Sequence, residues 1–286
     1  MNHSDRTAIP VVPTVLPTDV DMTIGCPPPY GTLRVVPGLE RLYHGRQPWL
    51  GQAQQDEYAK LHLDTNNDGG ARGYVFNGAF EGSMELQAAV ALYDAVRAHV
   101  REAKASGRTE YAMAETGTCD GLSTAFIARA LKDAAETRRT FPGRVWTCEW
   151  DDVRSTGVPR PWPKLWDELG LGGLVTPCVG DSRHEETWET GGRQAGKWAR
   201  TDRPLPRELD ALFIDSLHTE AQVMAEWDLL KGRLRAGGIV LMHDVFLPDV
   251  QGVEVARAMG RIAAELGAEP EFLDSCRGLA LIRKPE

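Results

Sequence analysis

Short apolar runs alternate with amphipathic stretches over most of the chain, and this alternation predicts its fold. Each run is short and rich in apolar side chains, as expected of a buried strand. The five runs are Tyr111–Ala114, Arg144–Trp150, Leu174–Val179, Leu209–Ile214 and Ile239–Met242. Because strands that alternate with helices pair in parallel, we expect an α/β protein with one mostly parallel sheet.

The stretches outside these runs carry a helical period. Apolar residues on one face predict a helix from about Met84 to Ala105 and another from about Val250 to Leu266. A third helix follows the fourth run, with apolar positions at Val223, Trp227, Leu230 and Leu234. We expect Gly237-Gly238 to end it. Two short terminal strands, Glu271–Leu273 and Leu279–Arg283, predict a hairpin that adds an antiparallel seventh strand to the sheet.

The segment Tyr111–Ile127 passes from the first strand through a glycine turn into a helix that opens on Ser123. Glu115 ends the apolar run, and Gly117 and Gly121 flank the turn, where missing side chains let a ligand approach the backbone. Amide groups at the start of the helix would face that ligand. The glycines stand four apart instead of following G-x-G-x-x-G, which argues against a nicotinamide dehydrogenase. We therefore expect a different cofactor at this turn.

Polar residues also stand at the carboxyl ends of the other four runs. They are Glu149, then Gly180-Asp181-Ser182, Asp215-Ser216-Leu217-His218, and His243-Asp244. Taken singly, each is an ordinary strand-end residue. Because the carboxyl ends of parallel strands meet at one edge of a sheet, their order and spacing favour a shared crevice.

Residues 213–246 read FIDSLHTEAQVMAEWDLLKGRLRAGGIVLMHDVF, and they carry a family resemblance. With the glycine turn, this segment resembles class I S-adenosylmethionine-dependent methyltransferases. More closely, it is similar to the catechol-type enzymes and to the branch of macrocin and rhamnosyl O-methyltransferases, including proteins called cephalosporin hydroxylase-like. The resemblance covers roughly Gly73 to Lys284. It implies a Rossmann-like sheet of seven mostly parallel strands with helices on both faces.

The resemblance implies S-adenosylmethionine as the cofactor. Its methionine end would lie at the glycine turn, its ribose hydroxyls on Glu149, and its adenine beside Asp181 and Ser182. The full set of cofactor residues implied in this way is Glu115, Gly117, Thr118, Asp120, Ser123, Glu149, Asp181, Ser182 and Asp215.

Metal-dependent relatives bind Mg²⁺ through an acid after the fourth strand and two neighbouring residues after the fifth, which here are Asp215, His243 and Asp244. The residue three positions after the first acid is their general base, here His218, with Asp215 beside it in the catalytic set. Leu217 departs from the pattern, because many relatives have a second carboxylate there. An imidazole at His243 also suits softer divalent ions better than Mg²⁺. On the alternative interpretation, these residues only hydrogen-bond locally.

Composition is consistent with a cytoplasmic enzyme that acts on a small molecule. The net charge of −9 disfavours nucleic acid, and no stretch is long and apolar enough to span a membrane. The N-terminus lacks the apolar core of a signal peptide. The five cysteines are widely spaced without a CxxC pair, which argues against a zinc cluster or a disulfide framework.

Proline content divides the chain into an extension, residues 1–72, and a methyltransferase domain, residues 73–286. Eight of the 18 prolines fall within the first 50 residues, so we expect an irregular extension there. It is predicted to be an arm over the site or a contact in a homodimer, and a partly disordered tail is the alternative. Tryptophans in the insertions after the second and third strands either stack on the acceptor or anchor long loops.

These features predict an O-methyltransferase that acts on a hydroxyl of a small molecule, such as a sugar or phenol of a secondary metabolite. A catalytically silent partner subunit with the same fold is the alternative, because Leu217 replaces a carboxylate. The acceptor, the metal and the oligomeric state are not encoded in residue spacing.

Overall fold

The structure is a computed structural model that describes most of the predicted catalytic domain. It describes Leu39, Met84 and residues 86–119, 121–135, 141–151, 162–191, 203–246, 250–274 and 278–286. Asp120, Cys26, Cys276 and most of the predicted extension lie outside these residues.

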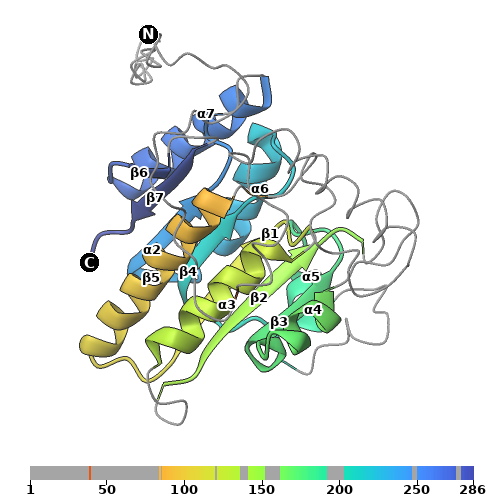
Figure 1. Cartoon of the computed structure of the whole chain (residues 1–286). Coiled ribbons are helices and arrows are strands. Elements are labelled where there is room, and N and C mark those ends of the chain that lie inside the picture. Colours follow the sequence, from red (N-terminus) through yellow and green to blue (C-terminus); the bar gives the residue numbers. More distant parts are fainter. Residues whose placement is uncertain are drawn as a thin grey trace, which may run out of the picture.

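Seven strands form one sheet in the order β3-β2-β1-β4-β5-β7-β6 (Figure 1). The strands are β1 (Tyr111–Thr116), β2 (Gly143–Glu149), β3 (Val175–Val179), β4 (Leu209–Ile214), β5 (Leu234–Met242), β6 (Glu271–Asp274) and β7 (Leu279–Arg283). The first five pair in parallel, and β7 is antiparallel to both β5 and β6. The predicted seven-stranded, mostly parallel sheet is confirmed.

Helices cover both faces of this sheet, as predicted. They are α2 (Leu86–Ala105), α3 (Leu122–Ala134), α4 (Trp162–Glu168), α5 (Glu185–Thr190), α6 (Glu220–Leu230) and α7 (Val250–Leu266), and a short 3₁₀ helix, η2, spans Gly172–Leu174. Strand β1 shows why there are two layers. Its alternate side chains Tyr111 and Met113 join the core of α2, α3 and α4, while Ala112 and Ala114 join the core of α5, α6 and α7. Figure 1 shows α2 and α3 side by side over the first of these faces.

Several predicted boundaries differ from the structure, and two of the differences change how a residue is interpreted. Strand β1 continues through Glu115 to Thr116 with all six side chains buried, so Glu115 does not end the strand. Helix α6 ends at Leu230, and Leu234 begins β5 instead of closing the helix. Gly237-Gly238 consequently lies inside β5. A Cβ at Gly238 would come within 3.0 Å of the Asp210 carbonyl oxygen, so tight strand packing, not helix termination, explains this glycine.

The extension contributes at least one residue to the core. Leu39 has no solvent exposure and packs in the cluster formed by α2, α3 and the adjoining strands. Tyr43, Trp49 and Leu50, which are aromatic and apolar residues of the same extension, lie outside the described residues.

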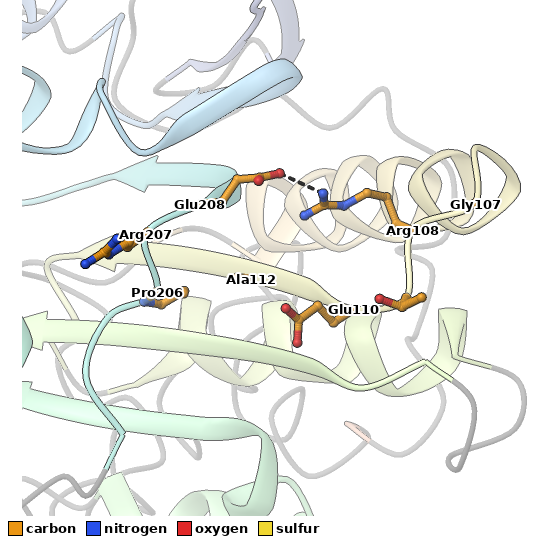
Figure 2. Close-up of a pocket in the computed structure, with 8 residues that line it drawn as sticks. Gly107, Arg108, Glu110, Ala112, Pro206, Arg207 and Glu208 are labelled. Carbon is orange, nitrogen blue, oxygen red and sulfur yellow. Dashed lines mark hydrogen bonds and ion pairs between the residues drawn. The ribbon is translucent and has the colours of Figure 1, made fainter.

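The amino ends of the strands form a polar edge that is distinct from the carboxyl ends. A pocket of about 400 Å³ opens there between the loops that precede β1 and β4 (Figure 2). The guanidinium of Arg108 and the carboxylate of Glu208 lie 2.7 Å apart across it. Buried Asp210 accepts a hydrogen bond from the Ala112 amide at 2.8 Å and one from Arg235 at 2.6 Å. These contacts hold the edges of β1 and β4 together, and the predicted site residues lie at the other end of the strands.

None of the helices in the described ranges has the length and apolar character needed to cross a bilayer.

Candidate functional site

The predicted site residues gather at the carboxyl edge, where the strand order reverses between β1 and β4. Strand β1 pairs with β2 on one side and with β4 on the other, and in open α/β sheets ligands bind outside the strand ends at such a point. Backbone hydrogen bonds join the loops. The Asp215 amide donates to the Thr116 carbonyl at 3.1 Å, and the Gly117 amide donates to the Cys148 carbonyl at 2.9 Å. The loops after β1, β2 and β4 therefore form one continuous wall.

Gly117 is required by the protein's own packing. Its φ is +83°, and a Cβ built on it would lie 1.9 Å from the Asp215 carbonyl oxygen. The sequence predicted that this glycine makes room for a ligand. The structure gives a different reason, because the backbone of the fourth strand's loop occupies the space that a side chain would need.

Helix α4 holds the glycine turn from outside. Trp162 donates its indole N–H to the Cys119 carbonyl at 2.6 Å, and Trp166 donates to the Gly121 carbonyl at 3.2 Å. The two rings stack at 9° with centroids 6.3 Å apart, and both are buried. Trp188 is buried in the same way and donates to the Ser182 carbonyl at 2.8 Å. These three tryptophans are loop anchors, which was one of the two interpretations of the insertions. Trp198 lies outside the described residues.

Glu115 lies beneath the turn instead of lining it. The side chain is fully buried, and its two carboxylate oxygens accept hydrogen bonds from Ser123 at 2.5 Å and Thr124 at 2.6 Å. Burial raises the pKa of Glu115 to about 7, although the two hydroxyl donors act in the opposite direction. In this arrangement Glu115 and Ser123 fasten the start of α3 to β1. Their predicted contact with a cofactor stays a prediction.

Glu149 is half-buried at the end of β2 and faces the turn after β1. Its Oε2 atom accepts a hydrogen bond from the Cys119 amide at 2.6 Å, and its Oε1 atom accepts one from the Trp150 amide at 3.0 Å. Cys119 has a φ of +48°, in the left-handed region that few non-glycine residues adopt. Glu149 thus fixes a strained turn by accepting two backbone hydrogen bonds. Thr118 is buried, and its hydroxyl lies 2.6 Å from that of Thr147.

Asp181 and Ser182 point in different directions after β3. Asp181 forms a two-pronged pair with the exposed guanidinium of Arg183, at distances of 2.6 to 3.1 Å. Hydrogen bonds from Arg183 lower the pKa of Asp181, which outweighs its partial burial. Ser182 is buried and donates its hydroxyl to Glu226 of α6 at 2.5 Å. Asp120, the remaining predicted cofactor residue, lies outside the described residues.

The predicted base and metal residues come together after β4 and β5. His218 Nε2 lies 2.9 Å from Asp244 Oδ2 and 3.7 Å from Asp215 Oδ1. His243 Nδ1 lies 3.4 Å from Oδ1 of Asp215 and 3.4 Å from Oδ1 of Asp244. Asp215, His218 and Asp244 each offer a donor atom within 4.8 Å of the others, which is compact enough to hold a cation. Asp244 adopts a φ of +62°, which aspartate tolerates better than most residues.

The charges in this cluster control the protonation of His218. Burial opposes the charged imidazole, but hydrogen bonds and charges from Asp215 and Asp244 outweigh it and raise the pKa of His218 to about 10. Asp244 is also buried, yet contacts with His218 and His243 lower the pKa of its carboxyl group well below the usual range. With only these side chains present, His218 is therefore an imidazolium at neutral pH.

Glu226 is a site residue that the sequence did not single out. It lies on α6 between Val223 and Trp227 and shares their buried face. An acid at that position of an apolar stripe was the available signal, because charged residues are almost never fully buried without partners.

The described cysteines carry no comparable signal. Cys148 and Cys178 are buried thiols whose pKa is raised by burial, to about 12 for Cys178.

Comparison with known proteins connects this geometry to a family. Residues 114–245 match a family described as a methyltransferase domain. That range begins in β1 and ends just after β5, so it contains every strand end described above. A search of curated proteins found no match.

Solved structures similar to this chain have low sequence identity to it. One is the O-methyltransferase TomG from Streptomyces achromogenes, involved in tomaymycin synthesis and solved with SAM, which is 17% identical over 89% of this chain and 92% of that chain, with a TM-score of 0.51. At this identity the likeness to TomG concerns the fold alone. Another similar structure is the SAH-bound methyltransferase PaMTH1 from Podospora anserina, 17% identical over 86% of this chain and 93% of that chain, with a TM-score of 0.45.

The packing at Gly117 generates a first prediction. We expect Gly117→Ala to lower the free energy of unfolding by more than about 2 kcal/mol, because a strained φ and a backbone clash combine. Gly107→Ala is the matched control, since Gly107 has a similar φ of +89° with nothing within 4 Å of the added Cβ. Urea unfolding of the three proteins measures the difference. Equal losses in the two variants would show that the contact with Asp215 is unimportant.

The burial of Glu115 generates a second prediction. Its pKa is raised from 4.5 to about 7 in the folded protein, so folding favours the protonated acid, and stability falls as pH rises from 4.5 through 7. Between pH 5 and 8 the wild-type protein should lose roughly 2–3 kcal/mol more unfolding free energy than Glu115→Gln. Urea titrations at the two pH values test this, with the exposed Glu110→Gln as control. If the stability of Glu115→Gln depends on pH as strongly as that of the wild type, Glu115 is not the source of the pH dependence.

Proposed function

We propose that this chain is a class I methyltransferase that transfers the methyl group of S-adenosylmethionine to a hydroxyl group of a small molecule. The observation that carries the proposal is the contact between Gly117 and the Asp215 backbone. It sets the turn expected to hold the cofactor directly against the loop that carries the acid and base residues. A methyl donor and a hydroxyl acceptor would therefore meet between the two loops.

We assign cofactor binding to the loops after β1, β2 and β3. Glu149 is the ribose ligand in this proposal, because its carboxylate stands at the carboxyl end of β2 and contacts the Cys119 amide in the glycine turn. The glycine turn would face the methionine end. Asp181 and Ser182 would border the adenine, with Ser182 held from behind by Glu226.

His218 is the proton acceptor in the proposed reaction. The acceptor oxygen forms a bond to the methyl carbon while the carbon–sulfur bond of the sulfonium breaks, and the hydroxyl proton passes to imidazole. The products are a methyl ether and S-adenosylhomocysteine. This role needs a neutral imidazole, whereas the neighbouring carboxylates hold the pKa of His218 at about 10. The pKa of His218 must therefore fall before His218 can accept the proton. This requires a positive charge that offsets the negative charges of Asp215 and Asp244.

A divalent cation fits that requirement. Two carboxylates and two imidazoles lie close together after β4 and β5, with His243 3.4 Å from both Asp215 and Asp244. We propose that Asp215, His243 and Asp244 would hold the cation, which leaves His218 free as the base. Such a mixed oxygen and nitrogen donor set suits Mn²⁺ or Zn²⁺ better than Mg²⁺. When bound, the cation would lower the pKa of the acceptor hydroxyl.

The acceptor class follows from charge and from the surface beside His218. The chain carries a net charge of −9, which disfavours an anionic polymer such as nucleic acid. Leu217 stands between Ser216 and His218 with 62% of its surface exposed, where relatives have a second carboxylate. An apolar side chain at the mouth of the crevice favours a ring or an alkyl group beside the reacting hydroxyl. The fold shared with TomG, an enzyme of tomaymycin synthesis, supports a secondary metabolite as acceptor.

Cofactor binding is the third prediction. Calorimetry should detect S-adenosylhomocysteine binding to the wild-type protein with a Kd in the micromolar range, weakened at least about 10-fold in Glu149→Gln by the loss of a charged acceptor. Glu189→Gln, whose side chain is 55% exposed on α5, is the control and should bind like the wild type. Absence of binding by a folded wild-type protein would refute the proposed function. Binding without methyl transfer across a panel of phenols and sugars would favour a silent partner subunit.

The fourth prediction concerns the different roles proposed for the two histidines, His243 as a ligand of the cation and His218 as the base. His243→Gln and Asp244→Asn should weaken Mn²⁺ binding at least about 10-fold, measured by calorimetry or by the electron paramagnetic resonance signal of free Mn²⁺. His218→Gln should leave Mn²⁺ binding within about threefold and reduce turnover roughly 10² to 10⁴-fold. His184→Gln, an exposed histidine beside Asp181, is the control. Loss of Mn²⁺ binding in His218→Gln would instead make His218 a ligand, in the compact set with Asp215 and Asp244.

A further inference from the structure

A second buried carboxylate lies behind the crevice and takes no part in the proposed chemistry. Glu226 has no solvent exposure, and four side chains donate hydrogen bonds to it. Its Oε1 atom accepts from Ser182 at 2.5 Å and from Gln222 at 2.8 Å. Its Oε2 atom accepts from Ser216 at 2.8 Å and from Thr116 at 3.0 Å. Both oxygens are thus fully engaged.

These donors come from separate parts of the sheet edge. Thr116 ends β1, Ser182 follows β3, and Ser216 follows β4. Ser182 and Ser216 are linked through the carboxylate, since each donates to a different oxygen of Glu226. Gln222 reinforces the link by donating to the Ser182 hydroxyl as well, at 3.2 Å.

Burying the Glu226 carboxylate costs free energy. Burial raises the pKa of Glu226, and the donors that oppose the rise are three hydroxyls and an amide. None of the ion pairs among the described residues includes this carboxylate, so hydrogen bonds must stabilise it. An apolar residue would complete the α6 stripe of Val223, Trp227 and Leu230 without that cost. The acid therefore serves a purpose that helix packing does not supply.

We propose that Glu226 is a positioning residue that joins the loop after β3 to the loop after β4, so that the cofactor side and the acceptor side of the crevice are set as one unit. The inference rests on the proposed function, which places Ser182 beside the adenine and Asp215 beside the acceptor. Ser216 is next to Asp215 in the chain. A displacement of the loop that carries Ser182 would therefore be transmitted through the Glu226 carboxylate to Asp215. Displacements of about 1 Å at reacting groups reduce rates on the order of 10²-fold.

Two variants of Glu226 test the link. Glu226→Gln keeps the size of the side chain and replaces one acceptor oxygen with a donor amide. Glu226→Asp keeps the charge but shortens the side chain by one methylene. Asp228→Asn is the matched control, because Asp228 lies on the same helix with 60% of its side chain exposed. Hydrogen exchange of peptides covering residues 179–191 and 212–219 should speed up at least about fivefold in both loops together in Glu226→Gln. The control should match the wild type.

S-adenosylhomocysteine binding provides the functional readout. Ser216→Ala should weaken binding several-fold although Ser216 lies on the acceptor side, and its effect with Ser182→Ala should be non-additive. In the Glu226→Gln background the same two changes should become additive. A merely structural role would lower stability in urea without this pattern, and the affinity of the folded Glu226→Gln protein would stay within about twofold of the wild type.

The outcomes separate this proposal from the proposed function. Unchanged exchange in either loop of Glu226→Gln, or additive serine effects in the wild-type background, would overturn the link. Absence of S-adenosylhomocysteine binding by the wild type would contradict the proposed function, while the exchange experiment would still decide whether Glu226 joins the two loops. Faster exchange in both loops with rescue by Glu226→Asp would support the carboxylate as the joining group.

Discussion

The close approach of Gly117 to the Asp215 backbone is the constraint on which the candidate site depends. Only a residue without a side chain lets the loop after β1 lie against the loop after β4. The Asp215 amide bonds to the Thr116 carbonyl at the same place, so the contact is also hydrogen-bonded. Through it, the two halves of a doubly wound sheet meet at their carboxyl ends. This backbone contact therefore positions the candidate cluster of Asp215, His218 and Asp244.

Two buried acids hold the segments around the candidate site by hydrogen bonds. Glu115 connects β1 to the start of α3, and Glu226 accepts hydrogen bonds from side chains at three strand ends. Their donors are neutral hydroxyl groups and, for Glu226, also the Gln222 amide. Buried polar networks whose groups are all hydrogen-bonded favour one structure. Asp215 and His218, which are only partly buried, lie close enough to affect each other's protonation.

Much of this architecture was predictable because its signals are local. The fourth strand and the helix from Val250 to Leu266 have the predicted boundaries, since apolar runs and helical periods report burial directly. Leu234 was misplaced because an apolar residue at helical spacing fits a strand start equally well. The clustering of Asp215, His218 and Asp244 followed from strand order. Glu226 was missed because its partners are spread over residues 116–222, and spacing does not encode contacts of that kind.

The burial of Leu39 has a consequence for how the chain folds. Proline content divides the chain near residue 72, yet Leu39 is fully buried in the core cluster that includes residues of α2 and α3. Removing a fully buried leucine leaves a cavity that typically destabilises a domain by about 2–5 kcal/mol. A truncated chain that begins at Gly73 would carry that cavity under its first helix. Leu39 thus connects the compositional extension to the core of the domain that follows, and we expect residues on both sides of the boundary to unfold together.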